Sequence, residues 1–328
     1  MTIPLSVLDL VPVGTGSSAG AALRNSVELA RLAERLGYAR YWFAEHHGMP
    51  SIASSAPEIL IGHIASATRR IRVGSGGIML PNHVPLQVAE RFHTLEALHP
   101  GRIDLGIGRA RGTDQATAQA IRPFDPARFS EQLTELLALS RQEYDDDHPF
   151  RSIRVVPDDV ELPPVWLLGS SGASARLAGE LGIGYSFARH FSHSSPLPGL
   201  QAYRECFQPS TRFPEPHVIL AVAVICAETE ERAEYLAASM DLTWVRLQRG
   251  QLGPLPTPEE ALVHRYTPSE LAIVRNYRSR SFVGTPASVR SRIDALAAET
   301  GASEVMVTSS IHGHAERLRS YELLKGRE

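Results

Sequence analysis

Lysine is almost absent from this 328-residue sequence, and its scarcity excludes several kinds of chemistry. Of the 33 basic residues, 32 are arginine, and the only lysine is Lys325. Schiff-base enzymes and P-loop nucleotide hydrolases both need a lysine held within a site. We therefore expect no aldolase or pyridoxal-phosphate chemistry, and no P-loop.

Cysteine and long apolar runs are also scarce. The two cysteines, Cys206 and Cys226, provide no disulfide framework and no zinc knuckle, which is typical of a reducing compartment. The longest apolar run, 218–226, has 9 residues and is too short to span a bilayer, and Asp9 interrupts the apolar run where a secretory signal would lie. A formal net charge of −3 indicates no affinity for nucleic acid or anionic membranes. We expect a cytoplasmic protein.

Short β-rich segments alternate with helical patterns along most of the chain. No G-x-G-x-x-G dinucleotide fingerprint follows the first of these segments. The alternation therefore favours an α/β fold, a (β/α)₈ TIM barrel formed as a single domain over 1–328, rather than a doubly wound sheet. The expected strands are 4–10, 41–44, 71–80, 102–108, 164–170, 184–189, the start of 217–240, and 303–311.

Residues 241–302 fit this alternation worst. Stretches such as "RGQLGPLPTPEE" and "SRSFVGTPASV" predict a long insertion followed by a helix. We expect insertion loops at the C-terminal face of the strands, with a mobile lid within 241–285.

Functional residues of such a barrel lie where its strands end. The polar and glycine residues at the expected strand ends are Glu45, His46, His47, Ser75, Gly76, Gly77, Arg109, Arg111, Ser170, Ser171, Ser174, Arg189 and His190.

The segment "LLGSSGAS", residues 167–174, is typical of a phosphate-binding helix start. A strand passes into serines and Gly172, and a helix begins near Ser174, so free backbone N–H groups and hydroxyls could hold an anion. A plain serine N-cap is the alternative. Arg109, at the end of the fourth strand, could supply a permanent positive charge to a phosphate or could serve as a structural ion-pair partner.

Three ionisable residues, Glu45, His46 and His47, follow the second strand directly. Adjacent strand residues point to opposite sides, so both histidines cannot easily bind one metal ion, and no H-E-x-x-H motif completes a metal site. No G-x-S-x-G motif supports a serine hydrolase. We expect no metal, one histidine at the barrel mouth as a hydrogen-bond donor or acid/base group, and the other packed or paired with Glu45. Surface or capping roles are expected for the remaining histidines, which include His63, His83, His93 and His99.

Together these segments resemble the bacterial luciferase-like flavin-dependent monooxygenases, and in particular the MsnO8-like subgroup. The similarity covers residues 41–114, 164–182 and 283–286, and with them nearly the whole chain. The resemblance implies a (β/α)₈ barrel that binds FMN and uses reduced flavin and O₂ to oxygenate a small organic substrate.

The resemblance also assigns individual residues. His46 matches the catalytic histidine at the reactive edge of the flavin, and Gly76 and Gly77 match a glycine pair that flanks a non-prolyl cis peptide behind the flavin ring. The residues that match the phosphate site are Arg109, Ser170, Ser171, Gly172 and Ser174.

Two departures from luciferase itself argue against light emission. Gly108 stands where luciferase carries a reactive cysteine, and Ser170 stands where it carries a glutamate. Arg111 replaces a proline that is frequent in close relatives, which would reshape the entrance. The loops 110–125, 189–215 and 241–285 match nothing that would name the substrate.

Partners follow from the same resemblance. Because no NAD(P)H fingerprint is present, we expect a separate flavin reductase to supply reduced FMN, and family members usually form homodimers through helices on one side of the barrel. Two other functions are compatible with the sequence: hydride transfer with a deazaflavin cofactor, and flavin binding without catalysis.

Overall fold

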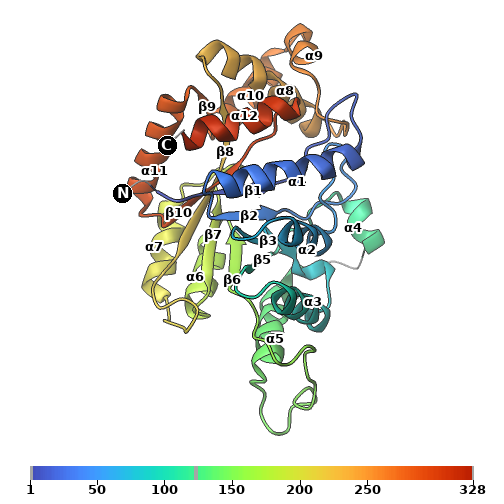
Figure 1. Ribbon diagram of the computed structural model, residues 1–328, viewed down its shortest axis with the longest axis vertical. Coiled ribbons are helices and arrows are strands. Elements are labelled where there is room, and N and C mark those ends of the chain that lie inside the picture. The colour runs from blue at the N-terminus through green and yellow to red at the C-terminus, as the bar shows by residue number, and fades with distance from the viewer. Residues whose placement is uncertain (1–2, 122–124, 327–328) are drawn as a thin grey trace.

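The computed structural model describes residues 3–121 and 125–326 of the chain, and its centre is a closed barrel of parallel strands (Figure 1). The eight barrel strands pair with one another in chain order. The last of them, β10, pairs with both β8 and β1, which closes the ring. The fold is therefore the predicted (β/α)₈ TIM barrel. The barrel strands are β1 Leu5–Asp9, β2 Arg40–Phe43, β3 Arg72–Ser75, β5 Ile103–Gly108, β6 Val165–Gly169, β7 Gly184–Ala188, β8 Val218–Cys226 and β10 Glu304–Thr308.

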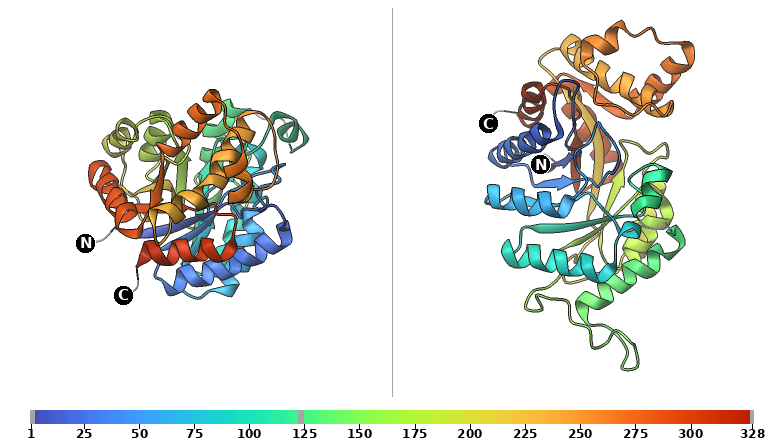
Figure 2. Two further views of the ribbon diagram at one scale, coloured as in Figure 1. Left: turned by 90° about the horizontal axis from the view of Figure 1, so that it is seen from above. Right: turned by 90° about the vertical axis from the view of Figure 1, so that its right-hand side faces the viewer.

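Helices between the strands cover the outside of the barrel (Figure 2). Several begin with proline at the first helical position, where the missing N–H costs nothing, and α11 ends at Gly301 in the left-handed conformation. The covering helices are α1 Ala19–Arg35, α2 Pro57–Ala67, α3 Pro85–Leu98, α5 Phe129–Arg141, α6 Gly172–Glu180, α7 Leu197–Cys206, α11 Pro286–Thr300 and α12 His314–Lys325, and a short α4 Gln115–Ile121 follows β5.

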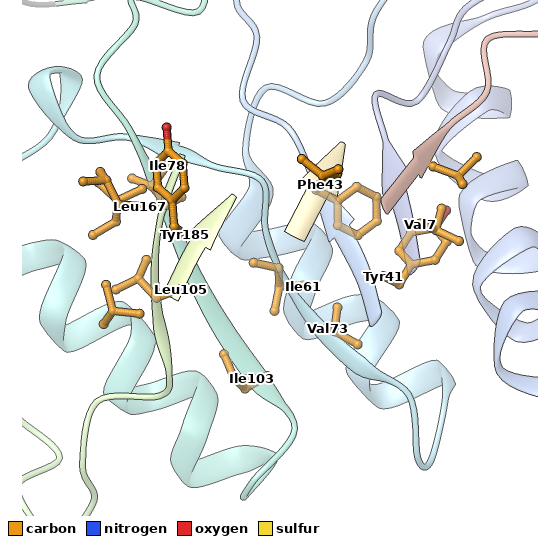
Figure 3. Close-up of a cluster of buried hydrophobic side chains, with 14 of the residues drawn as sticks. Val7, Tyr41, Phe43, Ile61, Val73, Ile78, Ile103, Leu105, Leu167 and Tyr185 are labelled. Atoms are coloured by element: carbon orange, nitrogen blue, oxygen red, sulfur yellow. The ribbon is translucent and has the colours of Figure 1, made fainter. Parts of the chain in front are cut away.

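Side chains alternate between the two faces of each strand, as strand geometry requires. Outward-facing residues such as Val7, Tyr41 and Phe43 pack beneath the helices in the main core, part of which Figure 3 shows. The inward-facing residues form a separate cluster within the barrel, which includes Leu8, Trp42, Ala44, Trp166, Ile219, Ala221 and Met306.

An ion-pair network fills the barrel at the N-terminal ends of the strands. Arg40 lies 2.8 Å from Asp104 and 3.0 Å from Glu304, measured between guanidinium nitrogens and carboxylate oxygens. Burial alone would raise the pKa of Asp104, but Arg40 and Arg72 hold it below its usual value. This end of the barrel is thus filled by paired charges, and the opposite end is left for the functional site.

Between β8 and β10 the chain adds more structure than predicted. The added elements are the helices α8 Glu230–Gln248, α9 Pro258–Val263 and α10 Pro268–Arg278 and the strand β9 Ser281–Gly284. Figures 1 and 2 show the three helices gathered at one end of the molecule. β9 pairs with the last four residues of β8, Ala223–Cys226. β8 has nine residues, more than any other barrel strand, and β9 covers the end that extends beyond the ring.

The insertion lies at the C-terminal face of the strands, as predicted. Leu255 N donates to Val13 O, and Thr15 N donates to Leu255 O, each at 2.9 Å, so the segment after α8 is tied to the first βα loop. The mobility expected of a lid within 241–285 stays a prediction. In the described residues no helix combines the length and apolar character needed to cross a membrane.

One predicted strand is divided in two. Residues 71–80 form β3 and a two-residue strand β4, Ile78–Met79, with Gly76 and Gly77 between them. β3 and β4 both pair with β5, so the interruption changes the backbone direction without ending the sheet.

Candidate active site

Glu45, the second residue after β2, is a fully buried anion on the outer side of the barrel wall. Its carboxylate accepts hydrogen bonds from His47 Nε2 at 2.9 Å, Asn82 Nδ2 at 3.1 Å, His83 Nε2 at 3.0 Å and Met79 N at 2.8 Å. Burial alone would raise the pKa of Glu45, but the hydrogen bonds from His47, His83 and Met79 N lower it to about 2. Glu45 therefore joins the end of β2 to the residues that follow β3.

His46 takes the opposite side of the strand end. Trp42 and Ala44, at alternate positions before it, both belong to the cluster within the barrel, so His46 faces the mouth. His46 Nδ1 lies 3.2 Å from Gly112 O. Because a carbonyl only accepts, Nδ1 carries the proton and Nε2 is left as an acceptor. Burial lowers the pKa of His46, so the ring is neutral near pH 7. One histidine thus faces the mouth and the other pairs with Glu45, as the sequence indicated.

A tight loop after β5 holds both histidines in place. His47 N donates to Gly112 O at 3.1 Å, and Thr113 Oγ1 donates to His47 O at 2.6 Å. Gly112 has φ +66°, and a Cβ there would lie 2.7 Å from Glu45 O. Only glycine fits this position, because a side chain would meet both the backbone strain and the close contact.

The peptide bond between Gly76 and Gly77 is cis, the geometry that the resemblance implied. A Cβ on Gly76 would lie 2.7 Å from Leu8 Cδ1, and a Cβ on Gly77 would lie 2.7 Å from Gly106 O. The wall between β3 and β5 consequently consists mainly of backbone atoms. A flat ring could approach such a surface closely.

The start of α6 has the features of an anion site. Ser171 is the N-cap residue, and its side chain makes no capping hydrogen bond, so the orphan N–H groups of the first turn keep their capacity to donate. Ser174 Oγ donates to Ser171 O at 2.9 Å and lies 3.2 Å from the Tyr185 hydroxyl. Tyr185 also donates to Ser171 O at 3.2 Å, so β7 fixes the shape of this loop.

Arg109 directly follows β5, which pairs with β6, the strand that leads to α6. Its side chain is exposed. Within residues 3–121 and 125–326 no hydrogen bond or ion pair engages its guanidinium, so the structural ion-pair role considered for Arg109 finds no partner there. The guanidinium is available to an anionic ligand bound at the neighbouring helix start.

Sequence reasoning missed several residues that shape the site. His83 was expected at the surface or at a cap, but it is only partly exposed and bonds Glu45. His93 was expected there too, but it is buried and joins α3 to Ser140 Oγ at 2.7 Å. Asn82 and Tyr185 carried no strand-end signal. Their roles depend on partners that the fold, and not the local sequence, brings near.

Comparisons with known proteins identify the family of the chain. The sequence matches the family described as luciferase-like monooxygenase over residues 3–304. A luciferase-like monooxygenase of Escherichia coli is 45% identical over 98% of this chain and 96% of the relative. The N-acetyl-S-alkylcysteine monooxygenase of Bacillus subtilis is 36% identical over 98% of this chain and 97% of the relative.

A solved structure supports the same relationship. The crystal structure of apo-MsnO8 is 40% identical, has a TM-score of 0.89, and the match covers 99% of this chain and 97% of that one. The family match spans nearly the whole chain, and the relatives are matched along almost their full length. The chain therefore belongs to the bacterial luciferase-like family of flavin-dependent monooxygenases, enzymes that incorporate molecular oxygen.

Proposed function

We propose that this chain is an FMN-dependent monooxygenase of small organic substrates and that a separate flavin reductase supplies the reduced FMN. The observation that carries the proposal is the convergence, at one end of the barrel, of a neutral histidine with a fixed tautomer, a backbone wall at Gly76–Gly77, and an anion site at α6. A flavin needs all three: a proton-handling group at its ring, a flat surface behind the ring, and a cradle for its phosphate.

The residues present fit FMN. Ser170, Ser171, Gly172 and Ser174 would bind the phosphate through backbone N–H groups and hydroxyls, and Arg109 would neutralise its charge. Reduced FMN, when bound, supplies the two electrons with which one oxygen atom of O₂ enters the substrate and the other leaves as water.

His46 would act on protons at the reacting edge of the ring. Its Nδ1 is held by Gly112 O, so Nε2 is the atom that accepts or returns a proton. The buried Glu45 network and the loop over 111–113 hold His46 in this orientation. A ring bound within the barrel would be shielded from water, which would limit wasteful release of peroxide.

The named relative guides the choice of substrates. An enzyme of N-acetyl-S-alkylcysteines among the relatives suggests thioethers as the first class to test, beside aldehydes and aromatic compounds.

Two measurements test the proposal. Fluorescence titrations with FMN and with the deazaflavin cofactor should show tighter binding of FMN, and the reverse order would favour hydride transfer instead. Turnover with a flavin reductase, NADH and isotopically labelled O₂ should then place one labelled oxygen atom in a product of the panel. Peroxide as the sole product from every compound would count against oxygenation.

A further inference from the structure

His190 is the second residue after β7 and occupies a fixed position there. Its backbone N donates to Ala221 O at 3.0 Å, and its ring Nδ1 lies 3.3 Å from the same carbonyl. Arg280 Nη1 donates to Phe191 O at 2.5 Å and Arg189 Nη1 donates to Arg280 O at 2.7 Å, so the chain on either side is tied to the region before β9. The ring is therefore held in one orientation.

His190 and His46 lie on opposite walls of the barrel. In the closed ring, three strands separate β2 from β7 in either direction. Ala221, the residue that His190 bonds, belongs to the cluster within the barrel. Burial, together with repulsion from His46 and Arg280, lowers the pKa of His190 to about 4, although the Ala221 carbonyl opposes this. The two histidines thus share one space, and His190 is neutral at pH 7.

The tautomer of His190 follows from its contact with Ala221. Because the carbonyl only accepts, Nδ1 carries the proton and Nε2 is an acceptor. Nε2 lies on the ring edge away from Nδ1 and hence away from the wall. No donor in the described part of the chain reaches it. A partly buried acceptor without a protein partner calls for a donor from a ligand or from water.

We propose that His190 Nε2 accepts a hydrogen bond from an O–H or N–H group of the ligand in the barrel mouth, on the wall opposite His46. The inference rests on the proposed function, because it takes that ligand to be the flavin or the oxygenated substrate. A ribityl hydroxyl, a flavin ring N–H and a substrate amide or hydroxyl share this donor chemistry.

Two substitutions separate ligand binding from a structural role. His190→Asn keeps a donor near the Nδ1 position for the Ala221 carbonyl and removes the acceptor at the Nε2 position. His190→Gln does the opposite. We expect His190→Asn to weaken ligand binding about tenfold, the effect of one lost hydrogen bond of ~1.4 kcal/mol, and His190→Gln to weaken it less than about threefold. His63→Asn, an exposed histidine on α2, is the matched control.

The readouts identify the donor. A rise in the Kd of FMN, measured by fluorescence quenching, assigns it to the flavin, whereas a rise in substrate KM with the Kd of FMN unchanged assigns it to the substrate. The inference is overturned if neither constant moves in His190→Asn, or if His190→Gln is the more damaging change, since the ring would then serve only to bond Ala221.

A measurement on the unsubstituted protein covers the case in which a variant does not fold. Nitrogen NMR of labelled histidine should show the unprotonated Nε2 resonance of His190 shifting on addition of FMN, or of the substrate to the FMN complex. An unshifted resonance at saturating ligand contradicts the inference. If wild-type protein binds FMN and oxygenates substrate while these tests fail, the inference alone falls; if it does neither, the proposed function falls.

Discussion

At the scale of single residues, the site depends on a buried anion. Glu45→Gln keeps the size of the side chain but removes the charge that accepts from His47 and His83, leaving donors without a full acceptor. We expect a loss of about 2–3 kcal/mol in the free energy of unfolding and a lower kcat, with a smaller change in FMN affinity because Glu45 faces away from the mouth. Urea denaturation and steady-state kinetics measure both.

Glu58→Gln is the control for this change. Glu58 pairs with Arg91 at 2.8 Å on the surface of the molecule, where such a pair contributes less than about 1 kcal/mol. Equal losses from the two substitutions would refute the special role of the Glu45 network.

A second residue-scale prediction concerns His46. His46→Ala removes the Nε2 that we place at the reacting edge, so oxygenation should fall roughly 100- to 10,000-fold. FMN binding should persist, since the phosphate site lies on other strands. Product yield per NADH consumed, with peroxide measured in parallel, checks this. If the product yield is unchanged while FMN binding persists, His46 has no catalytic role, and the interpretation of the chain as a flavin-binding protein without catalysis gains support. His63→Ala serves as the control.

At the scale of elements, helix α6 and the end of β5 are expected to recognise a phosphate. Arg109→Ala should raise the Kd of FMN about ten- to a hundredfold, the effect of losing a charge-assisted hydrogen bond worth ~1.5–3 kcal/mol. Riboflavin lacks the phosphate, so its Kd should not change. Parallel fluorescence titrations make the comparison, and an equal effect on both flavins would remove Arg109 from the phosphate site.

The elements also show which parts of the fold can be predicted from the sequence. The eight barrel strands were predicted because short β-rich segments alternate with helical patterns along the chain. β8, with "VILAVAVIC", is apolar along its whole length. β9 was not predicted. Its four residues have little pattern of their own, and what makes them a strand is the extended end of β8 against which they pair.

At the scale of the whole molecule, buried histidines make stability depend on pH. His190 has a pKa of about 4 in the fold against about 6.5 when unfolded, so between these values the unfolded state binds the additional proton. Stability should therefore fall by roughly 2–3 kcal/mol as pH drops from 7 to 4. Urea denaturation across this range measures the slope. His190→Asn should reduce the dependence of stability on pH. An unchanged slope in this variant would mean that the His190 ring is not shielded from water in the folded protein.

Assembly is the other property of the whole molecule. The predicted homodimer stays a prediction, and the exposed apolar side chains on α2 and α3 support it: Ile59 is 74% exposed and Leu98 is 67% exposed. Light scattering should give twice the mass of 35.8 kDa. Replacing both residues with lysine should yield monomers, and a wild-type monomer would end this proposal.

Local pattern alone determined the barrel and the strand ends at which we propose the site. A buried strand and a helix start each need only a few neighbouring residues, and the strand ends of a barrel meet by topology. Local pattern also predicted that His46 and His47 face opposite sides, because adjacent strand residues do so. The family resemblance indicated that His46 is the one at the mouth.

Only the tertiary structure decided how those residues are held. His46 takes its tautomer from Gly112, 66 positions along the chain, and Glu45 takes its charge state in part from Met79 N and His83, 34 and 38 positions away. His190 lies on the wall opposite His46 because the ring closes between β8 and β10. Hydrogen bonds of this kind join loops whose separation in sequence has no period, so no local pattern records them; they exist once the barrel has brought the loops together.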